Sequence, residues 1–177
     1  IFLVLDAGRM MTARVLGKTK LDHSLQAALL LTYAALEAGD KVGVMAVARE
    51  VLCFLPPAGG MTQFGRILDA TYALEPRMEE PRFHLALSQL AAKVRKRSLI
   101  VMFTDFIDDR ASQGLMRMCL GLVPRHLPLV AAMSDTEVRG VADDIPRDWQ
   151  DLYRQGVAAE LLERRMALLA KLGSSGV

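Results

Sequence analysis

The feature of this sequence that most constrains its fold is a set of apolar runs in which polar residues do not alternate. Three of them, residues 1–5, 98–104 and 127–133, are rich in Val, Leu and Ile, and residues 41–47 form a fourth. Such continuous runs are typical of parallel strands buried on both faces. Because segments with helical spacing separate them, we expect a three-layer, Rossmann-like α/β fold whose mostly parallel sheet has helices on both faces.

The segments between these runs carry start and stop signals for helices. The first helix is expected to begin near Leu21, with Thr19 or Asp22 as its cap, and to end at Gly39. The other helices are predicted at about 62–74, 82–94, 110–122 and 148–172. The last of these carries one apolar stripe from Trp149 to Leu172, which is predicted to face the core.

One further strand, residues 50–55, is predicted to run antiparallel to strand 41–47 after a turn through Ala48-Arg49. Pro56-Pro57 and then Gly59-Gly60 are expected to end it. Because proline cannot donate a ladder hydrogen bond, this strand is placed at an edge of the sheet.

Composition favours a single packed domain over residues 1–177 and argues against several functions. The apolar fraction is 52%, and 22 basic residues nearly balance 20 acidic ones for a net charge of +2, so nothing points to a nucleic-acid partner. Cys53 and Cys119 stand alone among apolar residues, which favours reduced thiols and a cytoplasmic location. Because the chain opens directly on a strand, we interpret it as part of a longer protein.

Two acidic residues directly follow apolar strands. Asp6 follows the first run and Asp105 follows the run 98–104. If these strands are neighbours, the two carboxylates lie about 5 Å apart at the carboxyl end of the sheet, where open α/β sheets bind ligands. Carboxylates this close need a cation, and Mg²⁺ or Mn²⁺ held by Asp6 and Asp105 is one interpretation. Equally, both residues could simply cap the helices that follow.

The chain also resembles a known family. The likeness rests on residues 5–11, 19–23, 38–43, 97–105 and 158–162 and therefore extends over nearly the whole chain. These motifs, in this order and spacing, resemble the von Willebrand factor A-like domain of the bacterial domain-of-unknown-function-58 family.

This resemblance implies a sheet whose complete form has six strands, in longer proteins that are usually membrane-anchored. A further strand commonly follows a segment like 173–177, and its absence would leave an open sheet edge through which copies could associate. The resemblance also implies a partner protein, a MoxR-type AAA+ ATPase, and a role in assembling or activating other proteins. The domain would then lie in the cytoplasm or next to the membrane.

Domains of the von Willebrand factor A type carry a metal-ion-dependent adhesion site built from an Asp-x-Ser-x-Ser loop, a Thr and a second Asp. Asp6 matches the first aspartate of that site and Asp105 the last. Gly8 and Met10 stand at the two serine positions, and the threonine position falls at residues 81–82, a Pro-Arg pair. The resemblance therefore implies a degenerate adhesion site that lacks three hydroxyl ligands.

Other residues near these strand ends are candidates to complete or replace the site. Arg9 and Arg82 could neutralise Asp6 and Asp105 if they point into the same crevice. Possible substitute ligands are Glu79, Glu80, Thr104, Asp108 and Asp109.

We expect the loops at the strand ends to dock a partner. The residues of this predicted loop face are Gly8, Arg9, Met10, Met11, Arg82 and Asp109, with the segment 56–61 beside them. The methionines either offer an adaptable apolar surface or fill the core below the loops.

The alternative is a metal-dependent phosphoryl-transfer enzyme with Asp6 as the acceptor and a metal held with Asp105. It is the weaker interpretation, because a phosphatase of the haloacid dehalogenase type would need a second aspartate where this chain has Gly8. The sequence also lacks a Gly-x-Ser-x-Gly elbow, a P-loop and a Gly-x-Gly-x-x-Gly fingerprint.

Overall fold

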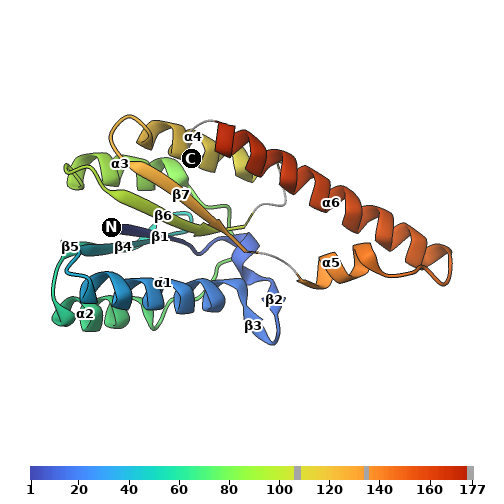
Figure 1. The fold of residues 1–177 in the computed structure, drawn as a ribbon, viewed down its shortest axis with the longest axis horizontal. Helices are drawn as coiled ribbons and strands as arrows, with labels where there is room; N and C mark the ends of the chain where they lie inside the picture. Colours follow the sequence, from blue (N-terminus) through green and yellow to red (C-terminus); the bar gives the residue numbers. More distant parts are fainter. Residues whose placement is uncertain (106–108, 134–135, 175–177) are drawn as a thin grey trace.

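A five-stranded sheet forms the middle layer of the protein (Figure 1). The computed structural model of the chain describes residues 1–105, 109–133 and 136–174. The strand order is β5-β4-β1-β6-β7, and β5 alone is antiparallel to its neighbour. The bounds are β1 Phe2–Asp6, β4 Val42–Val47, β5 Val51–Ala58, β6 Leu99–Thr104 and β7 Leu127–Ala132. The predicted α/β class, the strand neighbours and the antiparallel edge strand are confirmed.

Helices cover both faces of the sheet (Figure 1). One face packs against α1 (Lys20–Glu37) and α2 (Met61–Thr71), and the other against α3 (Phe83–Lys93), α4 (Asp109–Leu122) and the end of α6 (Trp149–Ser174). Alternate residues of β1 supply the two cores, because successive side chains of a strand point to opposite faces. Cys53 and Cys119 pack in different cores, on opposite sides of the sheet.

Both predicted capping residues act at the start of α1. Thr19 is the N-cap and accepts a hydrogen bond from the Asp22 amide, while the Asp22 carboxylate accepts one from the Thr19 amide. This reciprocal capping box satisfies amides that have no partner inside the helix. The helix ends beside Gly39, whose positive φ of 85° permits the tight exit.

The predicted end of β5 is wrong. The strand continues through Pro56-Pro57 to Ala58, with a register shift between Val42 and Val44 of β4. A bulge at a sheet edge can hold prolines because no ladder hydrogen bond is required from them there. Since β5 runs antiparallel, Ala58 lies beside Val42, at the amino ends of the parallel strands. The segment 56–61 therefore lies at the opposite end of the sheet from Asp6, and its predicted place on the loop face is wrong.

Four short elements were not predicted from the sequence. A 3₁₀ helix, η1 (Arg9–Thr12), follows β1, and the small hairpin of β2 (Arg14–Val15) and β3 (Lys18–Thr19) leads into α1. The fourth is α5 (Thr136–Asp143), which packs along α6.

The helix α6 and its neighbour α5 extend away from the sheet as a long projection (Figure 1). We call residues 136–160 the arm. The predicted core-facing stripe is wrong for this half of α6, since Trp149 is 75% exposed and Tyr153 is 71% exposed. The stripe reaches the core only near the helix end, where Leu172 is buried.

Among the described residues, no helix is both long and apolar enough to cross a membrane. The outer edge of β7 has no partner strand within the described part of the chain. Leu127 and Leu129 of this strand are exposed. Association of copies through this edge stays a prediction.

Candidate functional site

The two strand-end acids lie at the ends of neighbouring strands, as predicted. In β1 and β6, Leu5 pairs with Phe103, so that Asp6 comes opposite Thr104 and Asp105 follows directly. Both residues are buried, with relative exposures of 2% for Asp6 and 5% for Asp105. We call these two acids, together with Thr104, Lys20 and Arg165, the strand-end centre.

Neutral donors hold the carboxylate of Asp6. The Gly8 amide donates a hydrogen bond of 2.7 Å to Oδ1, and the Thr104 hydroxyl donates one of 2.6 Å to Oδ2. Burial raises the pKa of Asp6 to about 6, and the two hydrogen bonds counter this shift only in part. The negative charges of Glu80 and Asp105 add a smaller upward contribution to the same pKa.

Two cationic side chains hold Asp105 in its place. The Lys20 ammonium lies 2.6 Å from Oδ2, and the Arg165 guanidinium lies 3.0 Å from Oδ1. The Lys20 side chain is 0% exposed, and that of Arg165 is 13% exposed. Arg165 also donates a hydrogen bond to the Met133 carbonyl, so it joins α6 to the ends of β6 and β7.

Sequence reasoning missed Lys20 and Arg165. One signal for Lys20 was present: the residue directly follows the N-cap Thr19, and a helix N-terminus disfavours a cation. A lysine at such a position therefore requires another partner, which here is Asp105. No comparable signal marked Arg165, because its contact depends on how α6 packs on the sheet.

The predicted neutralising arginines are wrong. Arg9 forms an ion pair of 2.7 Å with Glu80, and both side chains are about half exposed, at 43% and 54%. Arg82 is exposed at the start of α3. The reason is local: η1 and the segment that precedes α3 run over the strand ends, so their long side chains turn outward to solvent.

Steric crowding explains the glycine at the first serine position of the adhesion motif. A Cβ atom on Gly8 would lie 2.7 Å from the Pro81 ring and 2.9 Å from the Glu79 carbonyl oxygen. Real Cβ atoms do not approach so closely, so a serine does not fit here unless the loop moves. Met11 is fully buried against Ala7 and Leu21, which corrects its predicted place on the loop face, whereas Met10 is half-buried.

The remaining substitute ligands are not gathered into a metal site by the described residues. The Thr104 hydroxyl donates a hydrogen bond to Asp6, and Glu80 pairs with Arg9. Asp108 lies outside the described residues, and Asp109 is described only as the first residue of α4. Across the described part of the chain, no group of three or more His, Cys, Asp or Glu side chains could hold a metal ion.

A divalent cation does not fit between the two acids as they are arranged. Asp105 already contacts two cationic side chains, and both oxygens of Asp6 accept hydrogen bonds. A metal here would have to displace the ammonium of Lys20. Removing one member of a buried ion pair typically costs about 3–5 kcal/mol.

This Rossmann-like sheet, with acids at the carboxyl ends of two adjacent central strands, resembles the fold of von Willebrand factor A domains. The solved SpRpn10 VWA domain shares this fold, with a TM-score of 0.52 at 17% identity over 77% of each chain. The protein BatB from Bacteroides thetaiotaomicron gives a TM-score of 0.49 at 15% identity, over 73% of this chain and 63% of that one. Residues 1–137 match the family described as "Protein of unknown function DUF58", and the chain belongs to that family. No curated protein matches the chain.

Proposed function

We propose that this domain is a protein-interaction module that binds its partner through the loops above the strand-end centre. The observation that carries the proposal is the state of the two acids: each is buried, and each has both carboxylate oxygens engaged within the chain. Groups held in this way shape a surface instead of reacting with a substrate. The loops that cover the two acids carry exposed side chains, some apolar and some charged.

The hairpin of β2 and β3 gives the most specific support for a binding surface. Its turn residues Leu16 and Gly17 both have positive φ, at 51° and 80°. Leucine is costly in this left-handed region, and Leu16 is also 83% exposed. An apolar side chain held in a strained turn and exposed to water contributes little to folding, which favours a role in contacting another molecule.

Other exposed groups extend this surface. Met78 is 74% exposed and its sulfur accepts a hydrogen bond from Thr12 of η1. The ion pair of Arg9 with Glu80 lies beside it and fixes the loop before α3 to η1. We call Arg9, Leu16, Met78 and Glu80 the docking surface; exposed apolar side chains together with charged ones suit a protein partner.

The partner that we propose is a MoxR-type AAA+ ATPase, and the process is the assembly or activation of other proteins. This part of the proposal rests on the family resemblance. The strand-end centre then acts as a degenerate adhesion site, in which buried charges support the loops that contact the ATPase.

A binding measurement with matched variants tests the proposal. We expect Leu16→Asn to weaken binding of the ATPase at least tenfold, because it removes the apolar contact. The melting temperature should stay the same or rise, since asparagine tolerates the left-handed turn. Leu30→Gln is the control, because Leu30 is 73% exposed on α1.

Two results would contradict the proposal. One is unchanged affinity for both Leu16→Asn and the charge reversal Arg9→Glu. The other is an equal loss of affinity for Leu30→Gln.

The enzyme alternative has less support. A phosphoryl acceptor must present an oxygen to its substrate, yet both oxygens of Asp6 are hydrogen-bonded and the residue is 2% exposed. We therefore expect no hydrolysis of a generic phosphate ester by the wild-type chain. Activity that Asp6→Asn abolishes would favour the enzyme instead.

A further inference from the structure

We propose that the side chain of Lys20 is the permanent cation of the strand-end centre. Its ammonium takes the part that a divalent metal takes in an adhesion site, and it makes this domain independent of metal ions. The inference deepens the proposed function, because it states how the docking surface is supported without an added ion. Arg165 contributes the second positive charge from α6.

Hydrogen bonds hold the backbone around Lys20, so that its side chain is directed toward the strand-end centre. The capping box of Thr19 and Asp22 holds the helix start, and the Lys20 amide donates a hydrogen bond of 2.8 Å to the Ala13 carbonyl. The side chain then runs through the interior, fully buried, to a contact of 2.6 Å with Asp105. A side chain positioned in this way is preorganised for its carboxylate, as a bound metal would be by its ligands.

The ammonium of Lys20 is enclosed by the protein and has no contact with solvent. The Lys20 side chain is 0% exposed, as is that of Asp105. A divalent cation placed between Asp6 and Asp105 would lie beside this buried positive charge and repel it. Glycine at position 8, where a Cβ would meet Pro81 and Glu79, removes one further hydroxyl ligand that a metal would need.

This arrangement has a consequence for recognition. In an adhesion site a partner's carboxylate completes the metal shell, whereas here Asp105 already has two cationic partners and the ammonium is enclosed. The partner therefore contacts the docking surface and not the centre. Binding is expected to survive a chelator.

The test uses the 177-residue chain alone with Mn²⁺ as the probe. Wild-type melting should be the same in EDTA and in about 5 mM Mn²⁺, since a ligand raises stability only when it binds the folded state. In Lys20→Ala, which vacates the ammonium, melting should become dependent on Mn²⁺ and saturable. Adding Asp105→Asn to that variant should abolish the dependence. Lys18→Ala, which changes an exposed lysine of β3, is the matched control and should behave as the wild type.

Two outcomes would overturn the inference. The first is a saturable rise of the wild-type melting temperature with Mn²⁺ that Asp105→Asn removes. The second is a folded Lys20→Ala that ignores Mn²⁺. If Lys20→Ala does not fold, the wild-type titration decides alone. Since no partner is present in these measurements, a failure to find ATPase binding would count against the proposed function and leave this result standing.

Discussion

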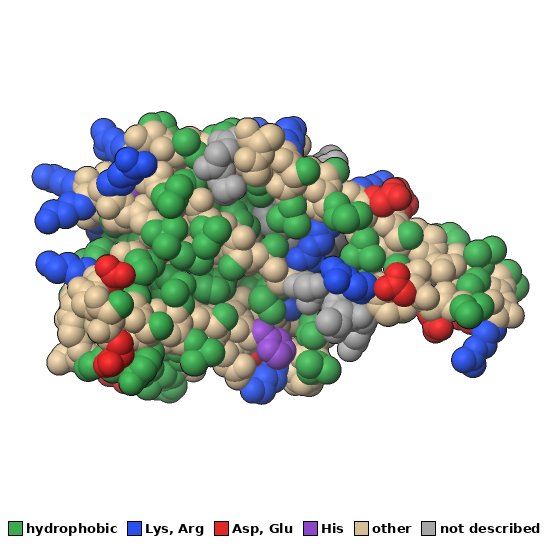
Figure 2. All heavy atoms as spheres, viewed as in Figure 1, with side chains coloured by type: hydrophobic (Ala, Val, Ile, Leu, Met, Phe, Trp, Pro, Cys, Tyr) green, Lys and Arg blue, Asp and Glu red, His purple; other side chains and the backbone are tan. Residues whose placement is uncertain are grey.

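The strand-end centre and the arm distribute their side chains in opposite ways. In the centre, Asp6, Lys20 and Asp105 are buried and Arg165 is largely buried, and these side chains contact one another or neutral donors, with Lys20 and Asp105 at 0% side-chain exposure. In the arm, large apolar side chains lie in water, with Ile145 at 82% and Trp149 at 75% exposure. Figure 2 shows hydrophobic side chains gathered toward the free end of this projection.

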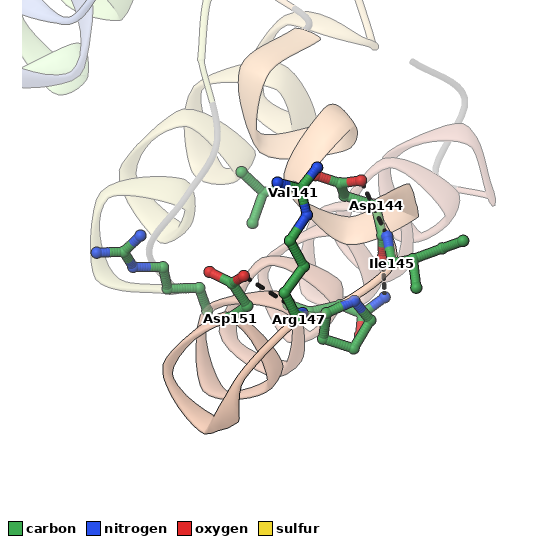
Figure 3. A pocket seen from close by; sticks show the side chains of 8 residues that line it. Val141, Asp144, Ile145, Arg147 and Asp151 are labelled. Carbon is green, nitrogen blue, oxygen red and sulfur yellow. Dashed lines mark hydrogen bonds between the residues drawn. The ribbon is translucent and has the colours of Figure 1, made fainter.

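The contrast shows in which region the side chains find their partners within the described chain. Buried charges persist only when they are paired or hydrogen-bonded; in the centre Asp105 is paired with Lys20 and Arg165, and Asp6 accepts two hydrogen bonds. Exposed apolar surface on one helix face gains nothing inside the chain and is typical of a region that contacts another molecule. A cavity of about 310 Å³ lies at the turn between α5 and α6, where the Arg147 amide donates a hydrogen bond to Asp151 (Figure 3).

The largest effect on stability is expected when the strand-end centre loses the carboxylate of Asp105, which both cations contact. Asp105→Ala leaves Lys20 buried without this carboxylate and releases Arg165. We expect the free energy of unfolding to fall by about 3–5 kcal/mol, the cost of breaking a buried pair from one side. Urea unfolding at neutral pH measures this change.

The control for this variant is Glu80→Ala, which breaks the exposed pair with Arg9. Exposed pairs contribute about 0–1 kcal/mol, so this control should unfold close to the wild type. Equal losses for the two variants would mean that the centre is no more than a surface ion pair.

Asp6 gives the centre a dependence on pH. Its pKa is about 6 in the folded chain against 3.8 in model compounds, so the folded state binds this proton more tightly. The resulting stabilisation is complete below pH 3.8 and is lost as the pH rises through 6, a change of about 3 kcal/mol. Asp6→Asn stays neutral and lacks this loss, so its stability relative to the wild type should rise between pH 4 and pH 7.

Unfolding of both proteins at matched pH values measures the difference. Comparison at the same pH removes the contributions of groups that do not interact with Asp6. A difference that is flat with pH would show that Asp6 ionises in the folded protein as readily as in the unfolded one.

Much of the fold could be predicted from the sequence because the strands are continuous apolar runs. Burial on both faces identified β1 and β6 as inner strands, and the places of Asp6 and Asp105 at their ends predicted that the two acids meet if the strands are neighbours, which they are. The capping of α1 could also be predicted, since Thr19 and Asp22 act locally on the backbone next to them.

The partners of the two acids could not be predicted in the same way. Lys20 is 85 residues from Asp105 in sequence, and Arg165 lies on a helix whose packing no local pattern fixes. The stripe from Trp149 to Leu172 also misled, because periodicity shows that a helix has an apolar face but not what covers it. Only the end of α6 packs on the sheet.

Arg165 connects the helix of the arm, α6, with the strand-end centre. Its replacement should uncouple the unfolding of α6 from that of the sheet. Arg165→Met keeps most of the apolar stem but removes the contacts with Asp105 and the Met133 carbonyl. We expect a loss of about 2 kcal/mol, because Lys20 still neutralises the carboxylate. Hydrogen exchange should become faster in residues 149–174 while β1 and β6 keep their protection.

Arg164→Met is the matched control for this variant, because Arg164 pairs with Glu160 one turn away on the exposed side of α6. It should change stability by less than about 0.5 kcal/mol and leave the exchange pattern as it is. Faster exchange throughout the sheet in Arg165→Met would show that the arm and the centre unfold as one unit.

The smallest effect on stability is expected in the arm itself. Trp149→Ser combined with Tyr153→Ser removes two side chains that are 75% and 71% exposed, so the free energy of unfolding should change by less than about 0.5 kcal/mol. If the arm contacts another molecule, the same variant should lower self-association in sedimentation velocity or binding of the ATPase. A loss of several kcal/mol would mean instead that these aromatic side chains pack within the chain, and the contrast between a self-sufficient centre and an incomplete arm would fail.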